Sequence, residues 1–201
     1  MKKVIVFAAM LLVSMSMFAQ VRVGAGYLNN NVATKSGNST TNSVLNGAYA
    51  GVSYSIPVSG DIYVTPGAFY SFLTGEQAIV STAKTKTTRH DVNIPVLVGY
   101  STDLGGVRVS VNAGPMFTCG LKATSNASAN IAGINISSGD IDLFKDADYN
   151  RFDVKALANA GFYFGTLGVN VGYAYGFLNQ IDNSNVTVNS NYAYAGISLA
   201  F

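Results

Sequence analysis

The sequence predicts an all-β fold: an eight-stranded antiparallel up-and-down β-barrel that crosses a membrane. Eight stretches alternate between apolar residues and small or polar residues, and this period of two is typical of strands. Charged residues make up only 11% of the chain, against about 25% in soluble domains. No stretch after residue 20 is an apolar run long enough for a membrane-spanning helix, which needs about 20 residues.

The alternating stretches recur at intervals, and each is long enough for a tilted membrane-spanning strand of about 9–11 residues. In the clearest one, the odd-numbered residues from Leu167 to Phe177 are apolar, and the even-numbered residues are Gly, Asn or Ala. Gly168, Gly172 and Gly176 also fit a G-x-x-x-G helix-pairing motif, but a strand explains the same spacing because it places all three on one face. The predicted strands are residues 21–30, 47–56, 61–73, 88–102, 107–121, 151–164, 167–179 and 191–201.

The connections between these strands alternate between short and long. Residues 57–60, 103–106 and 165–166 predict tight turns, whereas the longer connections are rich in Asn, Ser, Thr and Gly. With eight strands, this order places every long connection at one end and both termini at the other. Bacterial outer-membrane barrels have an even number of strands, short periplasmic turns and longer outside loops. The four outside loops are expected at about residues 31–46, 74–87, 122–150 and 180–190.

The second face of the strands distinguishes a membrane barrel from a water-soluble sandwich. A sandwich would oppose its apolar face with a charged one, but here the second face is mostly Gly, Ala, Ser, Asn and Thr. A small, polar interior suits a narrow barrel in lipid, where closure satisfies every backbone polar group. Aromatic residues near the strand ends fit the interfacial girdles of such barrels. They are Tyr27, Tyr54, Tyr100, Phe162, Phe164, Tyr175, Phe177 and Phe201.

Residues 1–19 predict a cleaved signal peptide, which leaves residues 20–201 as the barrel domain. Lys2 and Lys3 precede the apolar segment VIVFAAMLLV, and small residues lead to Ala19. A retained membrane anchor is the alternative, although the apolar segment is short for one. Of the 12 Lys and Arg residues, two leave with the signal peptide, so the remainder equals the 10 Asp and Glu residues. The charge therefore gives no reason to expect a nucleic-acid partner.

Four stretches within or overlapping these predicted strands have sequences typical of a known protein family. They are VNIPVLVGY (92–100), NAGPMF (112–117), RFDVKALANAGFYFG (151–165) and LGVNVGYAYGFLNQ (167–180). They resemble the outer-membrane β-barrel domain family of Gram-negative bacteria, often labelled porin family protein. The resemblance covers about residues 88–201 well and 20–75 loosely, and it implies a location in the cell outer membrane. Members typically end in an aromatic residue that the assembly machinery recognises, so the resemblance implies this role for Phe201.

Five charged residues are expected in the lumen toward the outer end, because they share the polar face of two predicted strands. They are Arg89, Asp91, Arg151, Asp153 and Lys155. They predict either a structural network of ion pairs that fills the barrel or a constriction for small solutes, since charged rings set selectivity in pores. Arg22 and Arg108 are expected inside at the periplasmic end, with Asp61 and Asp103 as candidate partners.

The only histidine, His90, is expected on the lipid face near the outer rim. Some eight-stranded outer-membrane barrels are lipid-modifying enzymes that use His, Ser and an acid. The best available partners, Ser81 and Glu76, lie in the neighbouring loop, and no nucleophile flanks His90 on its face. Acid–base catalysis needs a hydrogen-bonded pair, so an interfacial histidine without catalytic function is expected.

The acidic segment 139–148 carries Asp140, Asp142, Asp146 and Asp148. Closely spaced carboxylates can bind calcium, but the EF-hand spacing is absent, so a solvated loop is expected. Cys119 is the only cysteine, which excludes an intramolecular disulfide and a thiol metal cluster. We expect it on the lipid face.

The sequence thus predicts a small integral outer-membrane protein with a structural body and no enzymatic activity, cofactor or metal site. Its expected partners are outer-membrane lipid, the outer-membrane assembly machinery and an extracellular ligand bound through the loops, without nucleic acid, and we expect a monomer. The first hypothesis is surface display or adhesion through the 31–46 and 122–150 loops. The second is a narrow diffusion pore for ions or small solutes, and the third is a lipid-active enzyme.

Overall fold

The computed structural model describes residues 20–80, 83–131, 134–146, 149–181 and 186–201. The predicted signal peptide, residues 1–19, lies outside the described residues. No helix in the described part of the chain is long and apolar enough to span a membrane. The elements are β1 (Gln20–Ser36), β2 (Ser39–Ser59), β3 (Ile62–Val80), β4 (Ala83–Leu104), β5 (Val107–Ile131), β6 (Ile134–Asp142), α2 (Leu143–Asp146), β7 (Phe152–Phe164), β8 (Leu167–Gly176) and β9 (Val186–Ala200).

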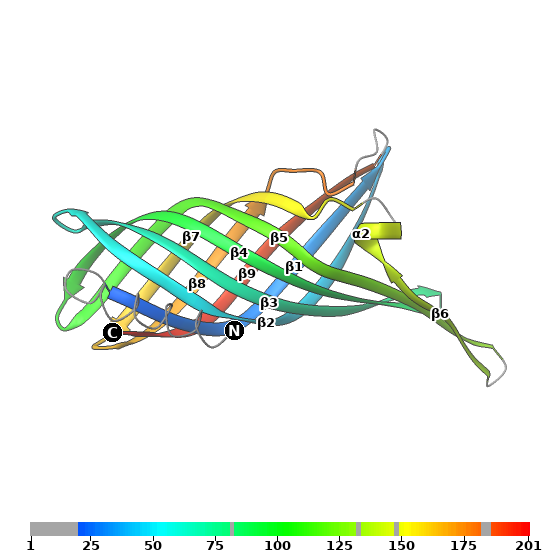
Figure 1. Ribbon diagram of the computed structural model, residues 1–201, viewed down its shortest axis with the longest axis horizontal. Coiled ribbons are helices and arrows are strands. Elements are labelled where there is room, and N and C mark those ends of the chain that lie inside the picture. Colours follow the sequence, from blue (N-terminus) through cyan, green and yellow to red (C-terminus); the bar gives the residue numbers. More distant parts are fainter. Residues whose placement is uncertain (1–19, 81–82, 132–133, 147–148, 182–185) are drawn as a thin grey trace, which may run out of the picture.

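Eight of these strands close into an antiparallel barrel (Figure 1). Hydrogen-bonded neighbours follow the order β4-β3-β2-β1-β9-β8-β7-β5, and β4 also pairs with β5, which completes the ring. The first and last strands are neighbours, since β1 pairs with β9 from Arg22–Ala200 to Ser36–Val186. Among the described strands, β6 pairs with β5 alone and lies outside the ring. The predicted fold class, an eight-stranded antiparallel barrel, is confirmed.

Three tight turns and both ends of the barrel sheet lie at one end of the molecule, the short-turn end (Figure 1). Gly60, Gly105 and Gly165 have φ values of 54°, 62° and 61°. This left-handed conformation is disfavoured by a Cβ atom, so glycine allows two strands to be joined by few residues. The backbone N–H of Phe201 donates to the Val21 carbonyl at 2.9 Å, which fixes the C-terminus to β1.

We call the opposite end of the barrel the hairpin end. Two segments there that were expected to be loops form β-strands instead. β1 and β2 stay paired up to Ser36 and Ser39, and β3 and β4 stay paired up to Val80 and Ala83. The expected loops 31–46 and 74–87 are therefore corrected to hairpins that continue the barrel ladder. Most residues of these segments are polar, so they show no regular apolar period, but each contains several threonines, which favour strands.

The segment 122–150 contains the largest departure from the predicted loops. β5 runs on to Ile131, and β6 pairs with it from Asp142 opposite Thr124 to Ile134 opposite Ile131. Together with the ends of β3 and β4, these strands form a four-stranded extension of the wall, the projecting sheet, made of residues 76–80, 83–88, 124–131 and 134–142. Figure 1 shows it reaching away from the barrel, with β6 at its far end.

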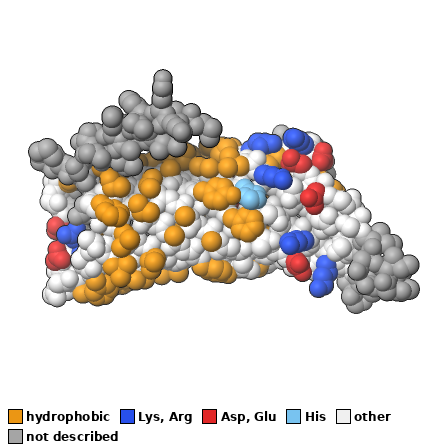
Figure 2. Space-filling view, turned by 60° about the horizontal axis from the view of Figure 1, so that its bottom comes forward, with side chains coloured by type: hydrophobic (Ala, Val, Ile, Leu, Met, Phe, Trp, Pro, Cys, Tyr) orange, Lys and Arg blue, Asp and Glu red, His pale blue; other side chains and the backbone are white. Residues whose placement is uncertain are grey.

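Side chains alternate between the lumen and the outer surface of the wall. In β4, Asp91, Asn93 and Leu97 are buried, whereas Val96 and Val98 are exposed. Large apolar side chains cover much of the outer surface (Figure 2). An apolar surface of this extent is suited to lipid rather than to water.

Candidate functional site

The structure brings together four of the five charged residues that were expected in the lumen. Arg89 and Asp91 come from β4, Asp153 and Lys155 come from β7, and none is more than 5% exposed. Arg89 Nε donates to Asp91 Oδ1 at 2.8 Å, and Lys155 Nζ donates to Asp153 Oδ2. Two cations and two carboxylates therefore face each other. We call these four residues the lumen cluster, and their formal charges sum to zero.

Gln180 and Tyr192 connect the two ion pairs, and neither was singled out from the sequence. Arg89 Nη1 donates to Gln180 Oε1, and Gln180 Nε2 donates to Asp153 Oδ2, both at 2.9 Å. The Tyr192 hydroxyl donates to Asp91 Oδ2 at 3.0 Å, and Lys155 Nζ lies 4.5 Å from the Tyr192 ring centroid. The alternation of the last strand predicts that Tyr192, like its other even-numbered residues, points into the lumen. Gln180 follows the end of β8, so no strand alternation predicts its position.

Arg151 does not join the lumen cluster. It is exposed, its Nη1 donates to the Leu121 carbonyl at 3.2 Å, and its guanidinium lies 4.8 Å from the centroid of the Phe144 ring in α2. β7 begins only at Phe152, so the alternation that pointed Arg151 inward does not extend to it. Arg151 instead connects α2 to the backbone of β5.

An apolar cluster packs in the same lumen, and each of the eight barrel strands contributes one residue to it. Its members are Leu28, Leu45, Leu73, Leu97, Met116, Leu157, Ala174 and Tyr192, all at most 6% exposed. Tyr192 belongs to both groups, since its ring packs here and its hydroxyl reaches the lumen cluster. Side chains from every strand thus meet inside the barrel, which is how barrels of eight strands are filled.

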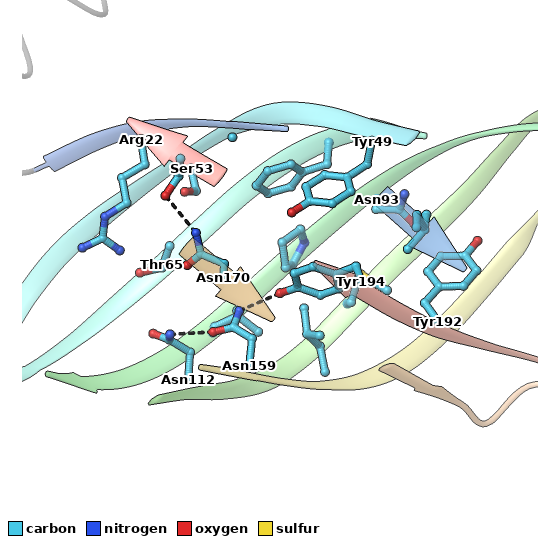
Figure 3. A pocket seen from close by; sticks show the side chains of 18 of the residues that line it. Arg22, Tyr49, Ser53, Thr65, Asn93, Asn112, Asn159, Asn170, Tyr192 and Tyr194 are labelled. Carbon is cyan, nitrogen blue, oxygen red and sulfur yellow. Dashed lines mark hydrogen bonds between the residues drawn. The ribbon is translucent and has the colours of Figure 1, made fainter. Parts of the chain in front are cut away.

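A cavity of about 110 Å³ lies inside the barrel, lined by polar side chains and by members of the apolar cluster (Figure 3). Asn112 Nδ2 donates to Asn159 Oδ1 at 2.7 Å, and Asn159 Nδ2 donates to the Tyr194 hydroxyl at 2.9 Å. Asn112 Oδ1 is buried and has no hydrogen-bond partner among the described residues. The cavity offers hydrogen-bonding groups to water or a small polar molecule, but its amides and phenols supply no nucleophile–base pair.

Both arginines expected inside at the short-turn end lie there, in different surroundings. Arg22 lines the cavity and is 8% exposed, and its guanidinium carbon lies 4.7 Å from the Tyr163 ring centroid. Arg108 is partly exposed, and its Nε lies 3.8 Å from Asp103 Oδ2. The predicted pairing of Arg108 with Asp103 is therefore present.

His90 lies on the outer surface, as expected from its position in the strand. Its Nδ1 is 2.5 Å from the Tyr70 hydroxyl, which occupies the nitrogen that a catalytic acid would need. Glu76 stands opposite Lys86, further toward the hairpin end, and Ser81 lies outside the described residues. The structure therefore shows His90 in an aromatic contact rather than beside an acid.

The acidic segment caps a helical turn. The backbone N–H of Phe144 donates to Asp142 Oδ1 at 3.0 Å, and that of Asp142 donates to Asp146 Oδ2 at 3.0 Å. Asp148 lies outside the described residues. Among those that are described, no three His, Cys, Asp or Glu side chains are placed to hold a metal ion.

The remaining two predicted positions are on the outside of the barrel. Cys119 is a free cysteine exposed on the outer surface, where the lipid face was expected. Phe201 is 77% exposed at the short-turn end.

The sequence pattern of a family described as outer membrane protein beta-barrel domain matches residues 14–182. A search of the curated proteins found no match. Among solved structures, the chain is similar to Ail, the attachment invasion locus protein of Yersinia pestis, at 14% identity and TM-score 0.46, with 92% of this chain and 100% of that chain covered. It is similar to Neisserial surface protein A at 16% identity and TM-score 0.43, with 91% and 97% covered. It is also similar to OprG from Pseudomonas aeruginosa at 10% identity and TM-score 0.47, with 92% and 96% covered.

Proposed function

This chain belongs to the outer membrane protein beta-barrel domain family, and from that premise we propose a surface-display or adhesion function. The barrel is the anchor in the outer membrane, and the projecting sheet presents a binding face to a partner outside the cell. The proposal includes export with removal of residues 1–19, assembly directed by Phe201 and a monomeric barrel. It includes no enzymatic step.

The observation that carries this proposal is the length of the strands that build the projecting sheet. A membrane crossing takes about 9–11 residues, whereas β4 has 22 residues and β5 has 25. The surplus is paired, up to Ala83 opposite Ala129 between these two strands. Ordering a residue costs about 1–2 kcal/mol of conformational entropy. A sheet that is already ordered can therefore bind a partner without that loss at the moment of binding.

The contents of the lumen support an anchor over a diffusion pore. The apolar cluster contains a side chain from every barrel strand, so a hydrated ion would have to displace packed core atoms to pass. The charges of the lumen cluster balance and are buried, whereas selective pores line a wet passage with charge of one sign.

Planar-bilayer recording tests the pore alternative directly. We expect no single-channel steps from the purified, folded barrel, and none from the Arg89→Ala variant. Steps in the wild-type protein whose size changes in Arg89→Ala would establish conduction through the lumen and would refute the anchor interpretation.

Removal of the β5 and β6 portions of the projecting sheet tests the display function. Residues 124–142 are replaced by a short Gly-Ser turn, and a control variant loses residues 34–41 from the β1–β2 hairpin instead. Bacteria that carry each variant are compared for attachment to a panel of purified matrix proteins and glycans, and the heat-dependent gel shift verifies that each barrel is folded. We expect attachment to be lost in the first variant and kept in the second. Equal attachment of both variants would refute the proposal.

A further inference from the structure

A groove of about 440 Å³ lies on the outer surface of β3, β4 and β5, where the projecting sheet leaves the barrel. Its floor is formed by alternate residues of β4 and β5. We call it the basic groove and define it by Lys84, Lys86, Thr88, His90, Lys122 and Thr124. Three of these six residues are lysines, on a barrel that has few charged side chains.

The strand register places cations on both sides of a row of hydroxyl groups. Thr88 of β4 pairs with Thr124 of β5, His90 pairs with Lys122, and Lys86 pairs with Asn126. Paired residues lie about 5 Å apart across the strands, and alternate residues about 7 Å apart along them. The ammonium-bearing residues therefore stand on either side of the Thr88–Thr124 pair on one face of the wall, which is a set of donors that a phosphate group can use.

A β-bulge in β5 makes this arrangement possible. The register shifts so that Asp91 pairs with Gly120 and His90 pairs with Lys122, which leaves Leu121 as the extra residue. Before the bulge, even-numbered residues of β5 point into the lumen, and beyond it Ala123 is buried while Lys122 is exposed. Without the extra residue, Lys122 and Thr124 would point into the lumen.

The lysines of the basic groove are available to a ligand. No ion pair or hydrogen bond of the Lys84, Lys86 or Lys122 side chain to another described residue occurs in the structure. Two carboxylates also line the groove, Glu76 of β3, which is the register partner of Lys86, and Asp140 of β6. Asp140 Oδ1 already accepts a hydrogen bond from Asn126 Nδ2 at 3.2 Å.

The basic groove begins where the apolar outer surface ends. The ring of His90 lies 6.0 Å from that of Tyr70 and 5.1 Å from that of Phe72, and both of these aromatic residues are more than 40% exposed. Figure 2 shows this boundary, with apolar side chains on one side of the histidine and charged side chains on the other. Aromatic residues mark the edges of the lipid-facing band in such barrels, so the groove lies at the depth of the lipid headgroups.

We propose that the basic groove binds the phosphate groups of a phosphorylated glycolipid in the outer leaflet. Lys86 and Lys122 face the phosphate charge, the hydroxyls of Thr88 and Thr124 donate to its oxygens, and the aromatic row below packs on the acyl chains. The inference rests on the membrane orientation given above and does not depend on an extracellular partner.

The test measures binding of lipid to the purified full-length barrel in a nonionic detergent by native mass spectrometry. The probes are lipid A with two phosphates, the same lipid with its phosphates removed, and inorganic phosphate. The variant is Lys86→Gln/Lys122→Gln, and the control Lys35→Gln/Lys145→Gln has the same change of charge at exposed positions outside the groove. The heat-dependent gel shift verifies folding of each protein.

We expect the wild-type barrel to prefer diphosphorylated lipid A over the dephosphorylated lipid, and the groove variant to bind it about tenfold more weakly or worse. The control variant should match the wild type. Equal binding of the phosphorylated and dephosphorylated lipids, or an equal loss in both variants, would overturn the proposal. Inorganic phosphate that binds as tightly as lipid A, with the same dependence on Lys86 and Lys122, would assign the groove to soluble anions and would also overturn it.

Discussion

Lys155 is the residue whose replacement tests the lumen cluster most sharply. Its side chain is fully buried, its Nζ pairs with Asp153 Oδ2, and the same atom donates to the Ser190 carbonyl at 2.7 Å. In Lys155→Met the Asp153 carboxylate keeps its bond from Gln180 but loses its cation. A buried charge left without its partner destabilises a protein by about 3–5 kcal/mol, which is a drop of at least about 100-fold in the folding equilibrium constant.

The double variant Lys155→Met/Asp153→Asn removes both charges and restores the balance with Arg89 and Asp91. It still loses the hydrogen bond to the Ser190 carbonyl, which is worth about 1–3 kcal/mol if that group stays unpaired. We therefore expect the double variant to be less stable than the wild type but more stable than Lys155→Met. Since the chain has no tryptophan, urea unfolding in lipid vesicles is followed by the heat-dependent gel shift. A loss below about 1 kcal/mol in Lys155→Met, or a double variant whose loss equals the sum of the single losses, would refute the ion-pair reasoning.

Three further predictions concern other parts of the chain. Leu157→Ala should lower the free energy of unfolding by about 2–5 kcal/mol, because a 5% exposed side chain of the apolar cluster is lost. The urea midpoint measures this change, and an unchanged midpoint would contradict a packed lumen. Phe201→Ser should reduce the fraction of heat-shifted protein in the outer membrane several-fold without changing the stability of the refolded barrel. Equal assembly would refute a recognition role for this residue. Arg151→Ala should increase proteolysis near α2, since it removes the cation–π contact with Phe144, and should change barrel stability by no more than about 0.5 kcal/mol.

The period of two was sufficient to predict the barrel, because one face of every strand contacts lipid. The same period predicted the lumen positions of Arg89, Asp91, Asp153 and Lys155, since each is an even number of residues from its neighbour in the same strand. It failed at a strand end. Arg151 lies one residue before β7, so the alternation of the strand does not extend to it.

The projecting sheet could not be predicted by the same reasoning, since β6 has no lipid on either side and so no apolar face to repeat. Its order comes from pairing with β5 over residues 124–131, a long-range contact that no local pattern reveals. Gln180 is a similar case. Its backbone N–H is held by the Val188 carbonyl at 2.9 Å, and its side chain reaches two strands on which the ion pairs lie.

The continuity of β4 and β5 from the barrel wall into the projecting sheet has a mechanical consequence. A flexible loop responds to tension as an entropic spring whose ends separate easily. Here the load on the sheet passes into the wall along two strands that are continuous over residues 83–104 and 107–131. Ladder hydrogen bonds lie across the strands, so a pull along β5 loads many of them at once in shear. A cell tethered through this sheet would be held by a continuous strand ladder rather than by an entropic spring.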